Sequence, residues 1–369
     1  MKKENNLPTL LFIMHMPPPV HGAAMVGQYI YDSKLFQENF DCHYINLATA
    51  KNLDDIGKKS LSKLWHFICL LTTICKTVKR IKPSLVYVTP NAKGAAFYKD
   101  FIVVALLKAM GCNIVVHYHN KGVVERKGHL LDKLLYKRFF RGLKVILLAK
   151  ELYDDISDFA SPEQVYICAN GIPDTVTHPI DRPSNTSFKF LFLSNMMKDK
   201  GVYTLLEACK LLKARGISFF CTFVGGWKDV TCAAFEHEVE KKRLTKYVLA
   251  TGPMYGNDKD KYWYEADAFI FPTYNECFPL VLLEAMQHGL PCISTNVGGI
   301  LSIVDEDNTS FIVHVGNADE LADKMQWMTE HRHEAAEMGK RGFEKYKAQY
   351  TLEIFETRLM KIFEEILNQ

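Results

Sequence analysis

The chain has 369 residues with a formal net charge of +3, of which 48% are hydrophobic and 24% charged. This composition is ordinary for globular proteins and excludes a largely disordered chain, while the length favours two domains. The ten cysteines form no CxxC pair. Because no apolar run approaches the roughly 20 residues of a membrane-spanning helix, we expect a reduced, cytoplasmic protein without a transmembrane segment.

Short apolar runs alternate with longer helical patterns along the first half of the chain. The runs predict strands buried on both faces of a parallel sheet, over residues 9–16, 41–47, 84–90, 113–119, 144–149 and 164–170. We therefore expect a doubly wound α/β domain in residues 1–180. These residues carry 23 Lys and Arg against 15 Asp and Glu, which favours an anionic ligand or surface there.

A stretch rich in Pro, Ser and Thr, residues 171–187, interrupts the pattern and is predicted to be a linker. The alternation then resumes, with strands predicted over residues 188–195, 218–225, 247–253, 268–273, 291–297 and 310–315. This indicates a second α/β domain in residues 181–350, with a ligand cleft between the carboxyl ends of the strands of the two domains. A final amphipathic helix, 351–369, is expected to pack back on the first domain.

Residues 276–299 place Glu276 and Glu284 at the ends of an apolar run that is followed by a glycine pair. Pro279 suits the first turn of a helix, and the backbone N–H groups at this helix start are predicted to bind an anion, namely those of Phe278, Leu280 and Val281. A phosphate there, with acids on both sides to accept bonds from hydroxyls, would suit a nucleotide diphosphate sugar. The simpler interpretation makes Glu284 an exposed helix position and Glu276 a cap.

Together these residues resemble the carboxyl-terminal signature of the retaining glycosyltransferases of family 4, which have the GT-B fold of two Rossmann-like domains facing across a cleft. In order, the signature is carried by Glu276, Phe278, Pro279, Glu284, Ala285, Gly289, Pro291 and Gly298-Gly299. The resemblance implies transfer of a sugar, with UDP-sugar the favoured donor, to a hydroxyl of a glycan or lipid-linked acceptor in cell-surface polysaccharide synthesis. Glu276 would position the sugar hydroxyls, and Glu284 would hold the ribose.

Residues 195–208 resemble the family segment in which two cations bind the donor diphosphate. Lys200, followed by Gly201, matches the lysine of that segment, although a solvated lysine at a helix start is the simpler interpretation. The family's arginine falls on Asn195, whose uncharged hydrogen bond to phosphate is roughly half as strong. Lys198 is a candidate to supply the missing charge.

The first domain offers two further candidates by the same resemblance. Gly22 lies in the loop after the first strand, where the family has a glycine whose amide meets the donor diphosphate or the acceptor; a tight turn is the alternative. His119 resembles the family's histidine beside the transferred sugar and is predicted to act in catalysis with Glu276 and Lys200. His117 competes with it, because residues two apart share one face of a strand, and a core histidine is the alternative for either.

We expect no metal and no cofactor, because helix dipoles and cations stabilise the diphosphate in enzymes of this type. The acid pairs within 258–260 and 305–307 are interpreted as polar loops. The basic helical stretches 58–82 and 127–144 either face anionic lipid, which would place the protein at the inner face of the cell membrane, or carry solvated lysines. We expect no nucleic-acid partner.

Two other functions stay open. A nucleotide-sugar epimerase of the GT-B type would use the same donor pocket without an acceptor. A catalytically degenerate transferase, with Asn195 in place of arginine, would act as a binding partner in an assembly complex. A dehydrogenase is disfavoured because no GxGxxG follows the first strand of either domain.

Overall fold

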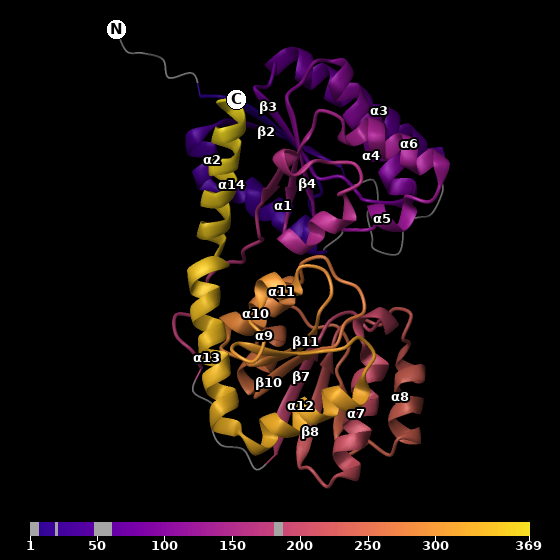
Figure 1. Ribbon diagram of the computed structural model, residues 1–369, viewed down its shortest axis with the longest axis vertical. Coiled ribbons are helices and arrows are strands. Elements are labelled where there is room, and N and C mark those ends of the chain that lie inside the picture. The colour runs from indigo at the N-terminus through magenta and orange to yellow at the C-terminus, as the bar shows by residue number, and fades with distance from the viewer. Residues whose placement is uncertain (1–6, 19–20, 48–60, 181–186) are drawn as a thin grey trace. The chain divides into compact units, whose positions relative to one another are not determined.

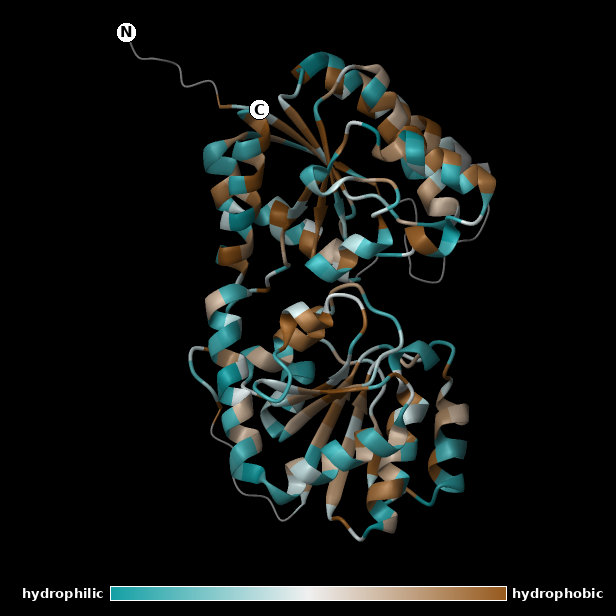
Figure 2. Ribbon diagram, in the orientation of Figure 1, coloured by the Kyte–Doolittle hydropathy of each residue, from teal (hydrophilic) through white to brown (hydrophobic). Residues whose placement is uncertain are grey.

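The computed structural model describes residues 7–18, 21–47, 61–180 and 187–369 (Figure 1). The chain forms two compact units, Met1–Asn170 with Leu352–Gln369, and Gly171–Thr351. Each unit is built around a six-stranded sheet in which all pairings between neighbouring strands are parallel. Figure 2 shows that the strands are predominantly hydrophobic, as expected for sheets covered on both faces.

The sheet of the first unit has the order β2-β1-β3-β4-β5-β6. Its strands are β1 (Thr9–Met14), β2 (Asp41–Asn46), β3 (Leu85–Val88), β4 (Ile114–Tyr118), β5 (Lys144–Leu147) and β6 (Val165–Ile167). Each lies within a predicted strand and is shorter than it. The helices are α1 (Gly22–Asp32), α2 (Lys34–Asn39), α3 (Leu61–Ile81), α4 (Gly94–Ala109), α5 (Val123–Arg126), α6 (Leu130–Phe140) and α14 (Leu352–Leu367), with 3₁₀ turns at Lys150–Asp155 and Pro162–Gln164.

Connections between parallel strands are right-handed, so the direction of each crossover decides which face its helix covers. The helices α3, α4 and α6 precede β3, β4 and β5, and each of these strands lies nearer to the β6 edge of the sheet than the strand before it in the chain. The three crossovers therefore run in the same direction, and their helices cover the same face. The connection through α1 runs the opposite way and covers the other face.

The last helix, α14, completes the first unit. Its buried residues recur at the three- and four-residue spacing of an amphipathic helix: Phe355, Leu359, Ile362, Phe363 and Ile366. The ring of Phe363 lies 6.0 Å from that of Phe12 in β1 and 5.9 Å from that of Phe36 in α2, measured between centroids. Burying side chains of this size contributes on the order of 2 kcal/mol each, so α14 is part of the core of this unit.

The sheet of the second unit has the order β12-β11-β10-β7-β8-β9. Its strands are β7 (Phe188–Leu193), β8 (Phe219–Val224), β9 (Val248–Ala250), β10 (Ala268–Phe271), β11 (Cys292–Thr295) and β12 (Ser310–Val313). The helices are α7 (Val202–Ala214), α8 (Cys232–Lys241), α9 (Asn257–Glu265), α10 (Leu280–Gln287), α11 (Ile300–Ile303), α12 (Ala318–Glu330) and α13 (Arg332–Gln349), with a 3₁₀ turn at Lys198–Lys200. Again, every strand falls within a predicted one.

The units divide at Asn170/Gly171 rather than at the predicted boundary of 180/181. Ile172 donates its backbone N–H to Tyr350 O at 3.0 Å, and Thr175 donates its own to the side chain of Gln287 at 2.8 Å. Because hydrogen bonds tie the start of the predicted linker to α10 and to the end of α13, these residues belong to the second unit. Residues 181–186 of that linker lie outside the described residues.

Candidate functional site

The strand order of the second sheet reverses between β7 and β10. The chain runs from β7 through β8 to β9 at one edge, and then returns to place β10 on the other side of β7. In open α/β sheets, ligands bind at such a reversal, beyond the carboxyl ends of the strands. The loops that follow β7 and β10 carry Lys200 and Glu276.

Lys200 and Glu276 meet at this reversal although they are 76 residues apart in the sequence. The ammonium of Lys200 donates to Glu276 Oε1 in an ion pair, with the two side chains 21% and 16% exposed. The same ammonium lies 5.9 Å from the centroid of the Phe271 ring. The structure therefore brings together the predicted diphosphate-binding cation and the predicted sugar-binding acid.

Glycine is required where the Lys200 loop passes the loop after β10. Gly201 has φ +81°, and a Cβ there would lie 2.0 Å from the carbonyl oxygen of Pro272. The backbone N–H of Tyr274 donates to Asp199 O at 2.8 Å. A larger residue at 201 would force the two loops apart, so Gly201 sets the position of the Lys200 loop against the β10 loop.

The glycine pair of the sequence signature supports Glu276 from the other side. Gly298 has φ +58°, and a Cβ there would lie 2.1 Å from Glu276 O. Gly299 donates its N–H to Cys277 O at 2.7 Å. The pair therefore lies directly on the backbone of the Glu276–Cys277 segment, and the close approach and positive φ at Gly298 require glycine at that position.

Helix α10 begins one residue later than predicted, at Leu280, with Pro279 as its extended N-cap residue rather than in its first turn, and without a side-chain cap hydrogen bond. Leu280 and Val281 occupy the first turn, in which backbone N–H groups have no partner within the helix. Phe278 is buried and its ring lies 6.2 Å from that of Tyr350, so its side chain belongs to the core and only its backbone remains a candidate ligand.

Glu284, in the second turn of α10, has an ion-pair partner that we did not predict. Its Oε2 accepts from the ammonium of Lys259 at 2.7 Å. Lys259 lies in the 258–260 stretch that we interpreted as a polar loop, but the structure places this stretch in the first turn of α9. The sequence offered one indication of a helix here. Trp263, which is buried, lies four positions after Lys259, and residues at this spacing share one face of a helix.

Asn195 is exposed and lies where the loops after β7 and β8 adjoin. A Cβ added at Gly226 would lie 3.3 Å from Asn195 Oδ1, and Met196 donates its N–H to Gly226 O at 2.8 Å. Lys198 donates its backbone N–H to the carboxylate of Asp229 at 3.2 Å. That Lys198 replaces the missing charge stays a prediction.

The first sheet reverses between β1 and β3, and histidines gather at this point. His15 follows β1 and donates its backbone N–H to Thr89 Oγ1, just after β3, at 3.1 Å. His21 caps α1, its Nδ1 accepting from the N–H of Ala24 at 3.3 Å, and the rings of His15 and His21 are 6.1 Å apart. Gly27 permits this packing, because a Cβ there would lie 2.0 Å from His15 O.

The two candidate histidines, His117 within β4 and His119 directly after it, differ in their partners. His117 is fully buried, its Nδ1 lies 2.8 Å from the hydroxyl of Tyr87, and its Nε2 has no partner in the described part of the chain, so one of its two ring nitrogens is paired within the protein. Both ring nitrogens of His119 are buried without a hydrogen-bond partner in the described part of the chain. Burial and the nearby His15 and His21 lower the pKa of His119 to about 3, so the ring is neutral and has one donor and one acceptor to offer.

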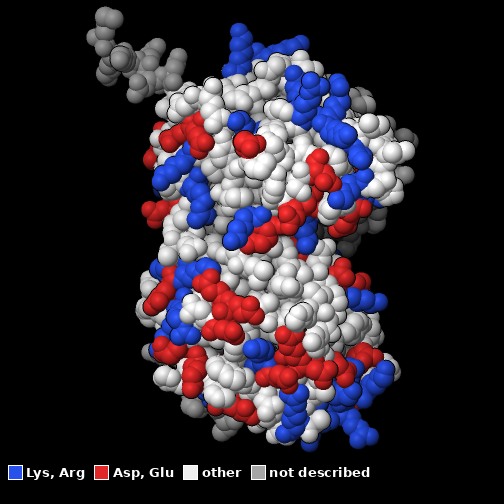
Figure 3. All heavy atoms as spheres, viewed as in Figure 1, with Lys and Arg blue, Asp and Glu red and all other residues white. Residues whose placement is uncertain are grey.

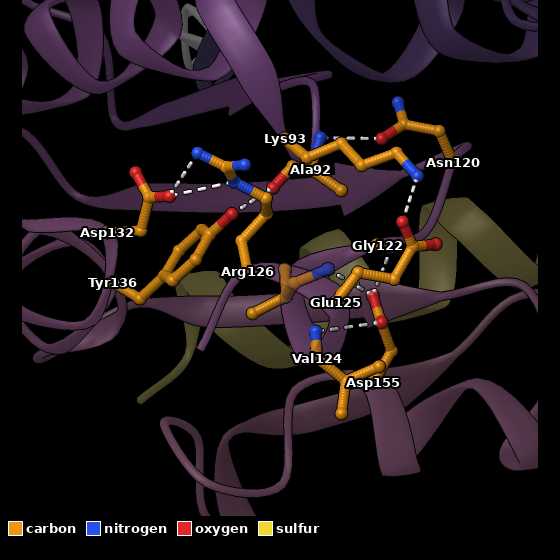
Figure 4. A network of polar contacts seen from close by, with 11 residues as sticks. Ala92, Lys93, Asn120, Gly122, Val124, Glu125, Arg126, Asp132, Tyr136 and Asp155 are labelled. Atoms are coloured by element: carbon orange, nitrogen blue, oxygen red, sulfur yellow. Dashed lines mark hydrogen bonds and ion pairs between the residues drawn. The ribbon is translucent and has the colours of Figure 1, made fainter. Parts of the chain in front are cut away.

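A network of polar contacts holds the loop that follows His119 (Figure 4). The N–H of Ala92 donates to Asn120 Oδ1 at 2.6 Å, and Lys93 forms an ion pair with Glu125. The carboxylate of Asp155 accepts from three successive backbone N–H groups at the start of α5, those of Gly122, Val123 and Val124. These contacts fix the chain immediately beyond the unpaired imidazole.

Gly22 is the first residue of α1, and a Cβ there would meet no atom within 4 Å. Packing within the described structure therefore does not require glycine at this position. The proposed phosphate or acceptor contact of Gly22 stays a prediction.

The described residues contain no cluster of three or more His, Cys, Asp or Glu side chains that could hold a metal ion. In the 305–307 stretch, Asp305 forms an ion pair with Lys345 at 2.7 Å. Nor does any helix within the described ranges have the length and apolar character needed to cross a membrane.

Three curated relatives are similar to this chain. D-inositol 3-phosphate glycosyltransferase of Paenarthrobacter aurescens is 27% identical over 38% of this chain and 35% of its own length. The capsular polysaccharide biosynthesis glycosyltransferase CapM of Staphylococcus aureus is 23% identical over 50% and 48%. The putative colanic acid biosynthesis glycosyltransferase WcaL of Escherichia coli is 22% identical over 88% and 80%. The chain thus spans less than half the length of the first two and four-fifths of the third.

Solved structures of other proteins share this fold over nearly the whole chain. Sucrose-phosphate synthase of Thermosynechococcus elongatus superposes with a TM-score of 0.76 at 17% identity, covering 98% of this chain and 99% of that one. Anabaena Alr3699/HepE in complex with UDP-glucose gives a TM-score of 0.72 at 14% identity, covering 97% and 99%. With two Rossmann-like units, the fold is that of the GT-B glycosyltransferases.

Residues 176–345 match the sequence model of the family Glycosyl transferases group 1. This range contains the Lys200–Glu276 and Lys259–Glu284 ion pairs, the start of α10 and the glycine pair Gly298-Gly299. The second unit therefore contains a Glycosyl transferases group 1 domain of the family 4 type, and the family resemblance and the fold predicted from the sequence are confirmed at this level.

Proposed function

We propose that this protein transfers a sugar from a nucleotide diphosphate sugar to a hydroxyl of a glycan or lipid-linked acceptor, with retention of the anomeric configuration. The observation that carries the proposal is the ion pair of Lys200 with Glu276 at the strand reversal of a group 1 domain. A cation and an acid held together at a ligand crevice provide one group for a diphosphate and one for the sugar attached to it.

Binding of the donor would break the Lys200–Glu276 ion pair and give each side chain a partner on the donor. Lys200 would turn from Glu276 to the diphosphate, and Glu276 would accept hydrogen bonds from the sugar hydroxyls. As the bond to the sugar breaks, negative charge develops on the leaving diphosphate, and Lys200 together with the first-turn N–H groups of α10 would stabilise it. Asn195 would add an uncharged hydrogen bond to the diphosphate.

The second ion pair would serve the nucleoside. Glu284 would accept from the ribose hydroxyls, and Lys259 would hold its carboxylate in position through the 2.7 Å contact. UDP-sugar is the favoured donor because the Alr3699/HepE structures contain UDP and UDP-glucose. Synthesis of a cell-surface polysaccharide is favoured because relatives carry names from capsular and colanic acid biosynthesis.

The first unit would contribute His119, whose neutral ring has both nitrogens available for sugar hydroxyls. Retention would follow from attack on the same face that the diphosphate leaves, with the leaving phosphate taking the proton of the acceptor hydroxyl. The proposal assigns charge stabilisation to Lys200 and α10 and needs no cofactor.

A panel of uridine, guanosine, adenosine and thymidine diphosphates tests the donor site by thermal shift. A ligand at a hundred times its dissociation constant adds about 2.7 kcal/mol of stability, so we expect a clear rise in Tm with one base. Transfer from the matching nucleotide sugar to a lipid-linked acceptor, with the product anomer identified by NMR, tests the reaction. An epimerised donor formed without acceptor would replace the transferase with an epimerase, and no shift with any nucleotide would favour a degenerate binding partner.

A further inference from the structure

The outer face of α6 exposes three leucines close together. Leu130, Leu131 and Leu134 are 82%, 62% and 66% exposed. The opposite face of the same helix is already occupied, since Tyr136, Phe139 and Phe140 are buried against the sheet. Scattered single apolar residues on a surface need no explanation, but an exposed apolar group of this kind marks an interaction site.

The exposed charged side chains of α6 itself are all cations. Between residues 127 and 144 the sequence holds a single acid, Asp132, and this residue is buried and paired with Arg126. The outer face of α6 exposes Lys133, Lys137 and Arg138, and Arg141 follows at its end. Figure 3 shows Lys and Arg side chains along the side of the first unit where α3, α4 and α6 lie.

Helix α3 extends the same surface. Trp65 and Ile68, in the part of α3 where side chains are described, are 64% and 44% exposed. Because α3, α4 and α6 cover one face of the parallel sheet, the first turns of all three lie toward the carboxyl ends of the strands. The exposed apolar residues of α3 and α6 lie within about the first two turns of each helix, so both helices present apolar side chains toward this end of one face.

We propose that this surface, Leu130, Leu131 and Leu134 with Lys133, Lys137, Arg138 and Arg141, docks the protein on an anionic membrane. Charge complementarity favours lipid as the occupant, because the exposed charged side chains of α6 are all cations, which attract anionic head groups and repel the same surface of a second copy. Leucines, with a nearby tryptophan, are the side chains that enter the boundary between head groups and acyl chains. The inference does not depend on the proposed transfer reaction.

Sedimentation of the full chain with vesicles tests this surface. We expect binding to phosphatidylcholine vesicles that contain phosphatidylglycerol, at least tenfold weaker binding to phosphatidylcholine alone, and loss of binding at high salt, since salt screens the attraction. Leu131→Asp/Leu134→Asp and Lys137→Glu/Arg138→Glu should each weaken binding tenfold or more. Neither double variant alters a buried side chain, and an unchanged Tm checks the fold.

Matched controls come from the second unit. Leu249→Asp changes a leucine that is 49% exposed on β9, and Lys340→Glu changes an exposed cation of α13; both should bind vesicles as the wild type does. Binding that is absent, equal on neutral lipid, or unaffected by the α6 variants would overturn the proposal. Concentration-dependent dimerisation that the leucine variant abolishes would assign the surface to a second copy instead. The nucleotide thermal shift should persist in every variant, which separates failure here from failure of the donor site.

Discussion

Replacing Glu276 by Gln should strengthen the binding of a free nucleoside diphosphate while reducing sugar transfer. In the absence of donor, Glu276 holds the ammonium of Lys200, and a diphosphate must compete for that cation. Glutamine keeps the size of the side chain but removes the competing charge. The same change removes a strong acceptor for sugar hydroxyls, so the nucleotide alone gains affinity and the nucleotide sugar loses it.

The expected gain in diphosphate affinity depends on how far the Lys200–Glu276 ion pair is exposed to solvent. Two unit charges about 4 Å apart interact by about 4 kcal/mol at an effective dielectric constant of about 20. Desolvation and side-chain ordering offset most of this, and partly exposed pairs retain about 1 kcal/mol. Because 1.4 kcal/mol corresponds to a factor of ten, Glu276→Gln should lower the Kd of the diphosphate about fivefold. Lys200→Ala removes a charge-assisted hydrogen bond and should raise the Kd by about tenfold or more.

Isothermal titration of the diphosphate with the highest thermal shift measures both changes. Glu337→Gln is the control, because Glu337 forms an ion pair with Lys340 at 2.7 Å on the surface of α13; it should leave the Kd unchanged. Weaker diphosphate binding in Glu276→Gln, or an unchanged Kd in Lys200→Ala, would refute the exchange of partners on which the reasoning rests.

Three further results are expected. In Gly201→Ala the new Cβ would meet the Pro272 carbonyl, so urea denaturation should show a loss above about 3 kcal/mol, whereas Gly216→Ala, with φ +73° and open space, should lose only about 1 kcal/mol of conformational strain. Lys259→Ala should weaken binding of the ribonucleotide several-fold but not of its 2′,3′-dideoxy analogue, which lacks the hydroxyls that Glu284 would bind; equal losses would assign Lys259 to the phosphates. Burial lowers the pKa of His119 to about 3, so the unfolded chain binds more protons below pH 6.5 and stability falls on acidification; between pH 7 and 5, His119→Gln should lose about 2 kcal/mol less than the wild type, and identical losses would contradict the buried neutral ring.

The strands could be predicted from the sequence because a parallel sheet covered on both faces leaves a distinct record of short, continuous apolar runs. The predicted carboxyl ends lie too far along the chain, because the predicted strands included residues such as His15 and His119, which follow the last paired residues of β1 and β4. The start of α10 was predictable from Pro279, whose missing N–H fits only a few positions.

Pairings between distant segments left no such record. No local sequence pattern links Lys200 to Glu276, which are 76 residues apart. From the sequence we predicted that each binds the donor, and not that the two side chains form an ion pair. The different surroundings of His117 and His119 depend on the position of Tyr87, a residue of a different strand, and the preference for His119 stays a prediction. The predicted linker began too early, at residue 171, because the start of this stretch belongs to the second unit. Its backbone hydrogen bonds to Tyr350 and Gln287 depend on the fold, which composition does not reveal.

The return of α14 to the first unit also has a consequence for biosynthesis. During translation the first six strands emerge early, yet the hydrophobic face that receives Phe363 stays uncovered until the ribosome has made the whole second unit and then α14. The second unit is continuous in sequence and can finish folding before its predecessor. The part of the polypeptide made first is therefore the part completed last, and exposed aromatic side chains around Phe12 and Phe36 are what chaperones would shield in the meantime.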